Sequence, residues 1–172
     1  MYRPINGASG YAATVDGRLL PEALRGRTSF VLIRLAALLR QDCAERLAGL
    51  GLSQHQHAIL CALAEFGPAA QKDVAARLGL DSGDLVAFLD GLQRAALISR
   101  DRDDRDRRRQ ILTITASGHE VLARAEETLD EGAQETLGAL DQRERAELRR
   151  LGLRVLMERT PEHWTAGAPT PA

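Results

Sequence analysis

The most distinctive segment of the sequence is an unbroken run of nine charged residues, 101–109, in which arginines are interspersed with aspartates. Such a run does not enter a hydrophobic core, so it must face solvent. Arginine suits contact with nucleic acids because its planar guanidinium binds phosphates and enters the narrow, electronegative minor groove of DNA. The interleaved aspartates orient neighbouring arginines and limit their mutual repulsion. The alternative interpretation is a solvated hairpin held by local ion pairs, as charge runs usually are.

The segments around this run favour the first interpretation. Residues 97–100 and 110–115 have the composition and alternation typical of short strands, so the run is predicted to be a hairpin loop. Upstream, apolar residues at three- and four-residue steps predict helices over 28–48, 53–67, 70–78 and 81–94. Downstream, helices are predicted from Thr115 or Ser117 and from Asp141. A short helix, a glycine-containing turn and a second amphipathic helix form a helix-turn-helix, which places its second helix in the major groove.

The composition of the chain argues against several classes of function. The formal net charge is -1, so any contact with nucleic acid depends on where the charges lie rather than on their sum. Cys43 and Cys61 lie in apolar helical patterns without the spacing of metal ligands. Aromatic residues make up only 3%, and no catalytic motif occurs. We therefore predict no enzyme, no cofactor and no metal site. The sequence has neither a run of ~18 apolar residues nor a leader pattern, so we expect a cytoplasmic protein without membrane contact.

Specific motifs resemble the MarR family of multiple antibiotic resistance regulators. They are Leu52-Ser53, Gln56, residues 58–60, 71–80, 97–100, 106–108 and 112–115, and Gly118. The resemblance extends over roughly residues 28–158. It is most specific in the charged hairpin, which in this family is called the wing. It implies a homodimer, built by interleaving the first helix with the last two, that binds palindromic operators in double-stranded DNA and usually represses transcription.

The expected fold is mainly α with a small antiparallel β-wing, a winged helix-turn-helix with long dimerisation helices at both ends. In chain order we expect a flexible N-terminal arm (1–27), a dimerisation helix (28–50), a DNA-binding lobe (51–115) with its wing at 100–110, C-terminal dimerisation helices (116–160) and a flexible tail (161–172).

The resemblance also assigns roles in the wing. Arg108 corresponds to the wing-tip arginine that enters the minor groove, and Asp106 to the carboxylate that orients it. Arg105 and Arg107 would then lie near phosphates.

The predicted helix 81–94 departs from the family pattern. It opens with acidic and apolar residues where many members place Thr, Ser and Arg against bases. Base readout is thereby reduced to Ser82, Gly83, Asp84 and Ala87, while Arg94 reaches the DNA backbone at most. We infer that the wing and DNA shape carry more of the affinity than is usual.

The resemblance further implies a pocket for a small aromatic or lipophilic effector that releases DNA. The predicted pocket residues are Arg34, Leu38, His55 and His57. Arg34 is suited to an anionic ligand or, equally, to an interface salt bridge. Because the two histidines are two residues apart on a helix they point in different directions, so joint chelation of one metal is not expected.

Two other functions stay open. The acidic helix 81–94 suits a helical protein-interaction module that uses the winged-helix scaffold without specific DNA binding. A thiol-based redox regulator using Cys43 is the second, although nothing in the sequence marks that thiol as activated.

Overall fold

The computed structural model describes residues 20–102 and 109–160, except the side chain of Ser82. The chain divides into two compact units, residues 1–132 and 133–172. The predicted tail 161–172 lies outside the described residues. In the part of the chain that is described, no helix has the length and apolarity needed to cross a bilayer.

In the described part of the first unit, the short helix α1 (Glu22–Arg25) comes first, and the long helix α2 (Thr28–Gly49) follows after two residues. The α2 bounds confirm the helix predicted over 28–48. The short helix α1 lies within the segment that was predicted to be a flexible arm, and residues 1–19 of that segment are outside the described range. Most of α2 is not buried within the chain, since Leu47 is its one buried residue.

The lobe that follows consists of α3 (Gln54–Phe66), β1 (Ala69–Ala70), α4 (Gln71–Leu78), α5 (Ser82–Arg94), β2 (Ile98–Arg102) and β3 (Gln110–Ile114). Its helices begin where the sequence supplies caps. The Ser53 hydroxyl accepts the Gln56 N–H at 3.2 Å, and the Gln56 side chain accepts the Ser53 N–H at 2.9 Å. Together these bonds satisfy two backbone donors that the helix start would leave unpaired. Asp81 caps α5 in the same sense by accepting the Gly83 N–H at 2.8 Å.

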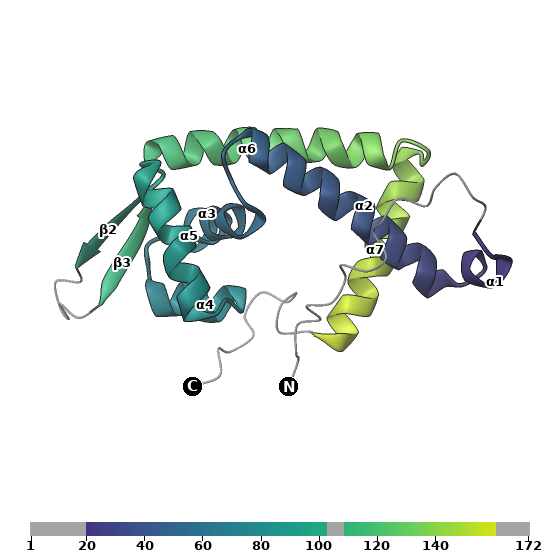
Figure 1. Ribbon diagram of the computed structural model, residues 1–172, viewed down its shortest axis with the longest axis horizontal. Helices are drawn as coiled ribbons and strands as arrows, with labels where there is room; N and C mark the ends of the chain where they lie inside the picture. The colour runs from purple at the N-terminus through teal and green to yellow at the C-terminus, as the bar shows by residue number, and fades with distance from the viewer. Residues whose placement is uncertain (1–19, 103–108, 161–172) are drawn as a thin grey trace. The chain divides into compact units, whose positions relative to one another are not determined.

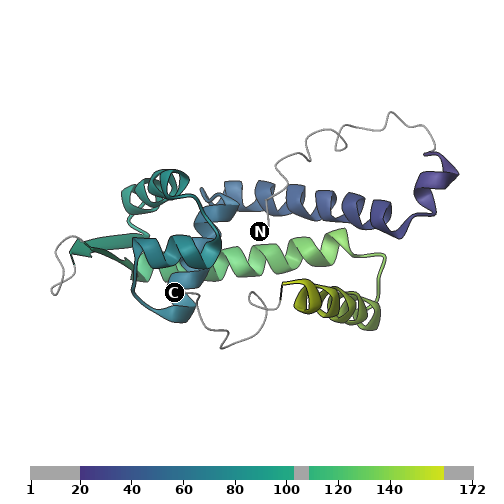
Figure 2. The ribbon, with the colours of Figure 1, turned by 90° about the horizontal axis from the view of Figure 1, so that it is seen from below.

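The three strands form one antiparallel sheet in the order β1-β3-β2. The hairpin of β2 and β3 was predicted, whereas β1 was not, because two alanines carry no strand pattern. In the register of the hairpin, Arg100 lies opposite Leu112 and Arg102 lies opposite Gln110. The hairpin projects from the lobe beyond α4 and α5 (Figure 1), which the second view also shows (Figure 2).

One hydrophobic cluster holds the lobe together. Its fully buried members include Ile59, Leu60 and Leu63 of α3, Val74 of α4, Leu85, Leu89 and Leu92 of α5, and Leu112 of β3. The apolar faces predicted for these helices therefore do form the core. Because three leucines of α5 are buried, the opposite face of this helix is free to meet another molecule.

Helix α6 (Ala116–Thr136) starts against the base of the wing, and its start is fixed by Thr115. The Thr115 hydroxyl donates to the Ala96 carbonyl at 2.7 Å and accepts the Gly118 N–H at 3.0 Å. Of the two caps proposed from the sequence, Thr115 is thus the one used.

The second unit contains α7 (Gln142–Arg159), which begins with a capping box formed by Asp141 and Glu144. No residue of α7 is buried within the chain. Four large apolar side chains of this helix are exposed: Leu151, Val155, Leu156 and Met157.

Candidate nucleic-acid interface

Helices α4 and α5 form the helix-turn-helix. Gly79 ends α4 in the left-handed conformation, with φ of 62°, which glycine adopts without strain. The chain then turns through Leu80 into the Asp81 cap of α5. Val74 of α4 is buried in the same cluster as Leu85 and Leu89, so the angle between the helices is set by packing.

The residues predicted to read bases lie on the exposed side of α5. Gly83, Asp84 and Ala87 are all exposed. Ala87 lies four residues after Gly83 and three after Asp84, so it shares a side of the helix with this adjacent pair. Ser82 is the first residue of the helix, and its side chain lies outside the described part. Arg94 is exposed at the last turn, where its Nε donates to the Asp90 carbonyl at 3.2 Å.

The wing residues with predicted roles lie outside the described residues. These are Arg105, Asp106, Arg107 and Arg108. The last described pair of the hairpin is Arg102 opposite Gln110, so the chain enters and leaves the segment 103–108 at neighbouring points. Both residues of this pair are exposed.

Two arginines of the wing hairpin, Arg100 in β2 and Arg109 just before β3, form ion pairs with helices of the lobe. Arg100 Nη2 lies 2.6 Å from Asp90 Oδ1 of α5, and the Arg100 side chain is only 13% exposed. Arg109 Nη2 lies 3.2 Å from Asp73 Oδ2 of α4, at a far more exposed position. The sequence pattern predicted that aspartates of the run itself would orient the arginines. For these two, the carboxylates come instead from α4 and α5, which ties the wing to the helix-turn-helix.

A hollow of about 690 Å³ lies between α4 and the distal end of the described hairpin. Its polar lining comes from the first turn of α4 and from the start of β3: Gln71, Lys72, Asp73, Arg109 and Gln110. Lys72 and the Arg109–Asp73 ion pair thus share one concave surface beside α5. Because the Asp73 carboxylate offsets the charge of Arg109, Lys72 is the cation there that would mainly attract a phosphate group.

Comparison with known proteins shows which family the helix-turn-helix and wing resemble. Residues 50–109, which span the lobe from the end of α2 to the wing, match the model of the MarR family. Over these residues the chain is therefore similar to MarR-family proteins. No match was found among curated proteins.

Several solved structures share this fold. A probable transcriptional regulator from Pseudomonas aeruginosa is 26% identical, with a TM-score of 0.64 over 77% of this chain and 98% of that one. A mutant of MarR from E. coli complexed with operator DNA is 21% identical, with a TM-score of 0.63 over 74% and 92% of the two chains. BpsR from Bordetella bronchiseptica, whose DNA binding is regulated by 6-hydroxynicotinic acid, is 21% identical, with a TM-score of 0.64 over 79% and 97%.

The four residues proposed for a MarR-type effector pocket have different surroundings. His55 stacks on Phe88 of α5, with 4.7 Å between ring centroids, whereas His57 Nε2 lies 2.7 Å from Glu126 Oε1 of α6. The two histidines therefore do point apart. Leu38 is exposed and Arg34 is half-buried, both on α2. None of the four lines the 690 Å³ hollow.

The two cysteines are both half-buried free thiols. Burial, reinforced by the negative charge of Glu126 nearby, raises the pKa of the Cys61 thiol to about 11. At neutral pH this sulfur therefore keeps its proton, which disfavours a role as a reactive redox sensor.

Proposed function

We propose that this protein is a member of the MarR family and a homodimeric, sequence-specific DNA-binding regulator of transcription. Helix α5 would enter the major groove, and the wing would reach the adjacent minor groove. The observation that carries the proposal is the exposed face of α5 beside an arginine-rich hairpin that ion pairs fix to the same lobe. The solved relatives with this fold include transcriptional regulators, one of them bound to operator DNA.

The positions of the charges in the lobe suggest how the affinity for DNA is divided between the wing and α5. Between Arg100 and Arg109 the sequence holds six arginines and four aspartates, whereas the whole chain has a net charge of -1. The exposed face of α5 offers Asp84 but no cation before Arg94. We therefore assign most of the electrostatic affinity to the wing, with Arg108 in the minor groove and Asp106 orienting it, and Arg105 and Arg107 near phosphates.

A DNA-binding measurement tests this division. The chain is titrated onto its own upstream region, or onto an operator found by in vitro selection, at several salt concentrations. Arg108→Ala should weaken binding by about 10- to 100-fold and reduce the salt slope by about one ion. Single changes in α5, such as Asp84→Asn, should cost less. Arg124→Ala on α6 is the matched control, because it removes one exposed arginine that lies outside α5 and the wing.

Two outcomes would contradict the proposal. If Arg108→Ala binds with unchanged affinity and salt slope, the wing-tip assignment is wrong. If the unmodified chain binds no DNA at low salt, a helical protein-interaction module becomes the better explanation of the acidic α5.

The homodimer rests on apolar surface that the single chain leaves uncovered. On α2, Val31, Leu32, Ile33 and Leu38 are at least half exposed. On α7, Leu151, Val155, Leu156 and Met157 are exposed as well. Soluble monomers rarely leave so much apolar side chain in water, so we assign both helices to the dimer. Light scattering should give the mass of two chains, and Ile33→Asp should shift it toward one.

We further propose that the protein represses transcription and that a small aromatic or lipophilic ligand releases it. The support is the regulation of BpsR by an aromatic acid, together with Arg34 on the partly uncovered helix α2. A panel of aromatic acids should therefore include members that lower operator affinity. Arg34→Ala should weaken that effect while leaving operator binding without ligand unchanged.

A further inference from the structure

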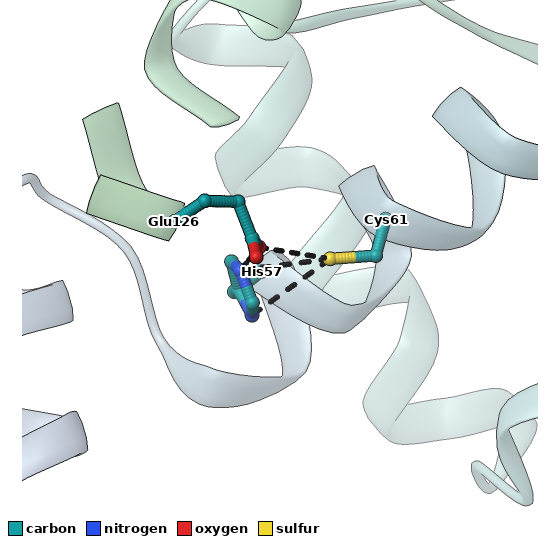
Figure 3. A group of neighbouring side chains, drawn as sticks. All are labelled: His57, Cys61 and Glu126. Carbon is teal, nitrogen blue, oxygen red and sulfur yellow. Dashed lines mark hydrogen bonds and ion pairs between the residues drawn. The ribbon is translucent and has the colours of Figure 1, made fainter. Parts of the chain in front are cut away.

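Three side chains that commonly bind transition metals meet on the side of the lobe where α3 faces α6. His57 and Cys61 lie one helical turn apart on α3, and Glu126 reaches them from α6 (Figure 3). Their nearest ligand atoms all lie within 4.8 Å of one another. We propose that His57, Cys61 and Glu126 form a binding site for a divalent transition metal ion, with Zn²⁺ as the best fit.

The distances between the ligand atoms are close to those of a tetrahedral zinc site. Cys61 Sγ lies 3.5 Å from His57 Nε2 and 3.7 Å from Glu126 Oε1. With ordinary zinc–ligand bond lengths at tetrahedral angles, these two separations are about 3.6 and 3.5 Å. The third separation, from His57 Nε2 to Glu126 Oε1, is 2.7 Å against about 3.3 Å in a zinc site. Only this contact has to open, by a few tenths of an ångström.

Moving the Glu126 carboxylate away from His57 is easy because the Glu126 side chain is exposed. Its side chain is 58% exposed, whereas the His57 side chain is 17% exposed. The carboxylate can thus rotate outward while the two ligands on α3 stay in place. The exposed side of the cluster also leaves room for water as a fourth ligand, as in zinc sites with three protein ligands.

The types of the three ligands determine which metal ion this site would prefer. Imidazole and thiolate favour Zn²⁺ and its neighbours in the first transition row, whereas Mg²⁺ and Ca²⁺ favour oxygen ligands throughout. Binding would release the thiol proton to solvent and form a metal–sulfur bond. The ion would also compensate the negative charge of Glu126, which otherwise opposes ionisation of Cys61.

The sequence did not point to this site. The pair considered there was His55 with His57, and that pair does not converge, because His55 stacks on Phe88. The ligand one turn after His57 is a cysteine, and the third ligand is 69 residues further along the chain. The proposed site departs from the prediction that this chain has no metal site, and it does not depend on DNA binding.

Metal titration of the tag-free, metal-depleted full chain tests the proposal. Co²⁺ should bind with one ion per chain and produce the visible bands of tetrahedral cobalt together with a sulfur-to-cobalt charge-transfer band. Zn²⁺ should displace it, since zinc stands above cobalt in affinity for such sites. Competition with a chromophoric chelator then gives the Zn²⁺ dissociation constant.

Variants locate the site. Cys61→Ser should abolish the charge-transfer band, and Cys61→Ser, His57→Gln and Glu126→Gln should each weaken Zn²⁺ binding at least about 10-fold. Cys43→Ala and His55→Gln are matched controls, each removing the same residue type outside the cluster, and both should bind Zn²⁺ as the unmodified chain does. Circular dichroism checks that each variant is folded.

Three results would overturn the proposal. The first is the absence of stoichiometric Zn²⁺ or Co²⁺ binding by the unmodified chain. The second is undiminished binding by folded Cys61→Ser and His57→Gln chains. The third is an equal loss of binding in the Cys43→Ala or His55→Gln control.

Discussion

Gly118 offers a sharp test of how the wing is joined to the long helix α6. A β-carbon at this position would overlap the Leu97 backbone carbonyl and lie 2.7 Å from Ile114 Cγ1. Neither neighbour moves easily, because Leu97 O also accepts the Thr115 N–H at 3.0 Å and Ile114 is held in β3. Gly118→Ala must therefore push the start of α6 away from the base of the wing.

The loss of folding stability expected for Gly118→Ala is the sum of three contributions. Overpacking of this kind costs about 1–3 kcal/mol, and weakening the bond from the Gly118 N–H to Thr115 Oγ1 costs about 1 kcal/mol. Alanine returns up to about 1 kcal/mol through its higher helix propensity. The net loss of stability is about 1–3 kcal/mol, which lowers Tm by about 3–10 °C for a chain of this length.

The assay is thermal unfolding followed by circular dichroism, with all chains at one concentration because a dimer's Tm depends on it. Gly49→Ala is the matched control, since its β-carbon would have no neighbour within 4 Å and its backbone is not left-handed. Its Tm should stay the same or rise slightly. If Gly118→Ala melts at or above the Tm of the unmodified chain, the close contact between α6 and the wing base is not as tight as described.

Two further predictions concern the thiol and the core. In a metal-depleted Cys43→Ala chain, alkylation of Cys61 near neutral pH should run about 100-fold slower than for a thiol of ordinary pKa. The reason is that burial and then Glu126 raise the pKa of Cys61 from 9.0 to about 11. The rate should keep rising with pH up to about 11, and Glu126→Gln should speed it; a fast, pH-insensitive reaction would contradict the described burial. In urea unfolding, Leu89→Ala should cost about 2–5 kcal/mol, since Leu89 is fully buried, whereas Val86→Ala on the exposed side of the same helix should cost well under half as much; equal losses would mean that α5 packs on a different face.

Except for α1 and β1, the sequence alone determined the described elements and their approximate limits, because these depend on residues within a few positions of one another. Ser53, Asp81 and Asp141 cap helices where the pattern placed them, and Gly79 ends α4. The spacing of leucines in α5 likewise determined which face of that helix is buried and which is exposed. The fold class and the position of the wing followed from the change in period after residue 96.

The partners of particular side chains were decided only by the tertiary structure. Strand β1 exists because it pairs with β3 some forty residues later, not because two alanines favour a strand. Arg109 meets Asp73 across 36 residues, and His57 meets Glu126 across 69. Contacts over such separations arise from how whole helices and strands pack, so no local pattern contains them. The ion pairs that anchor the wing and the proposed metal site both depend on such contacts between distant parts of the chain.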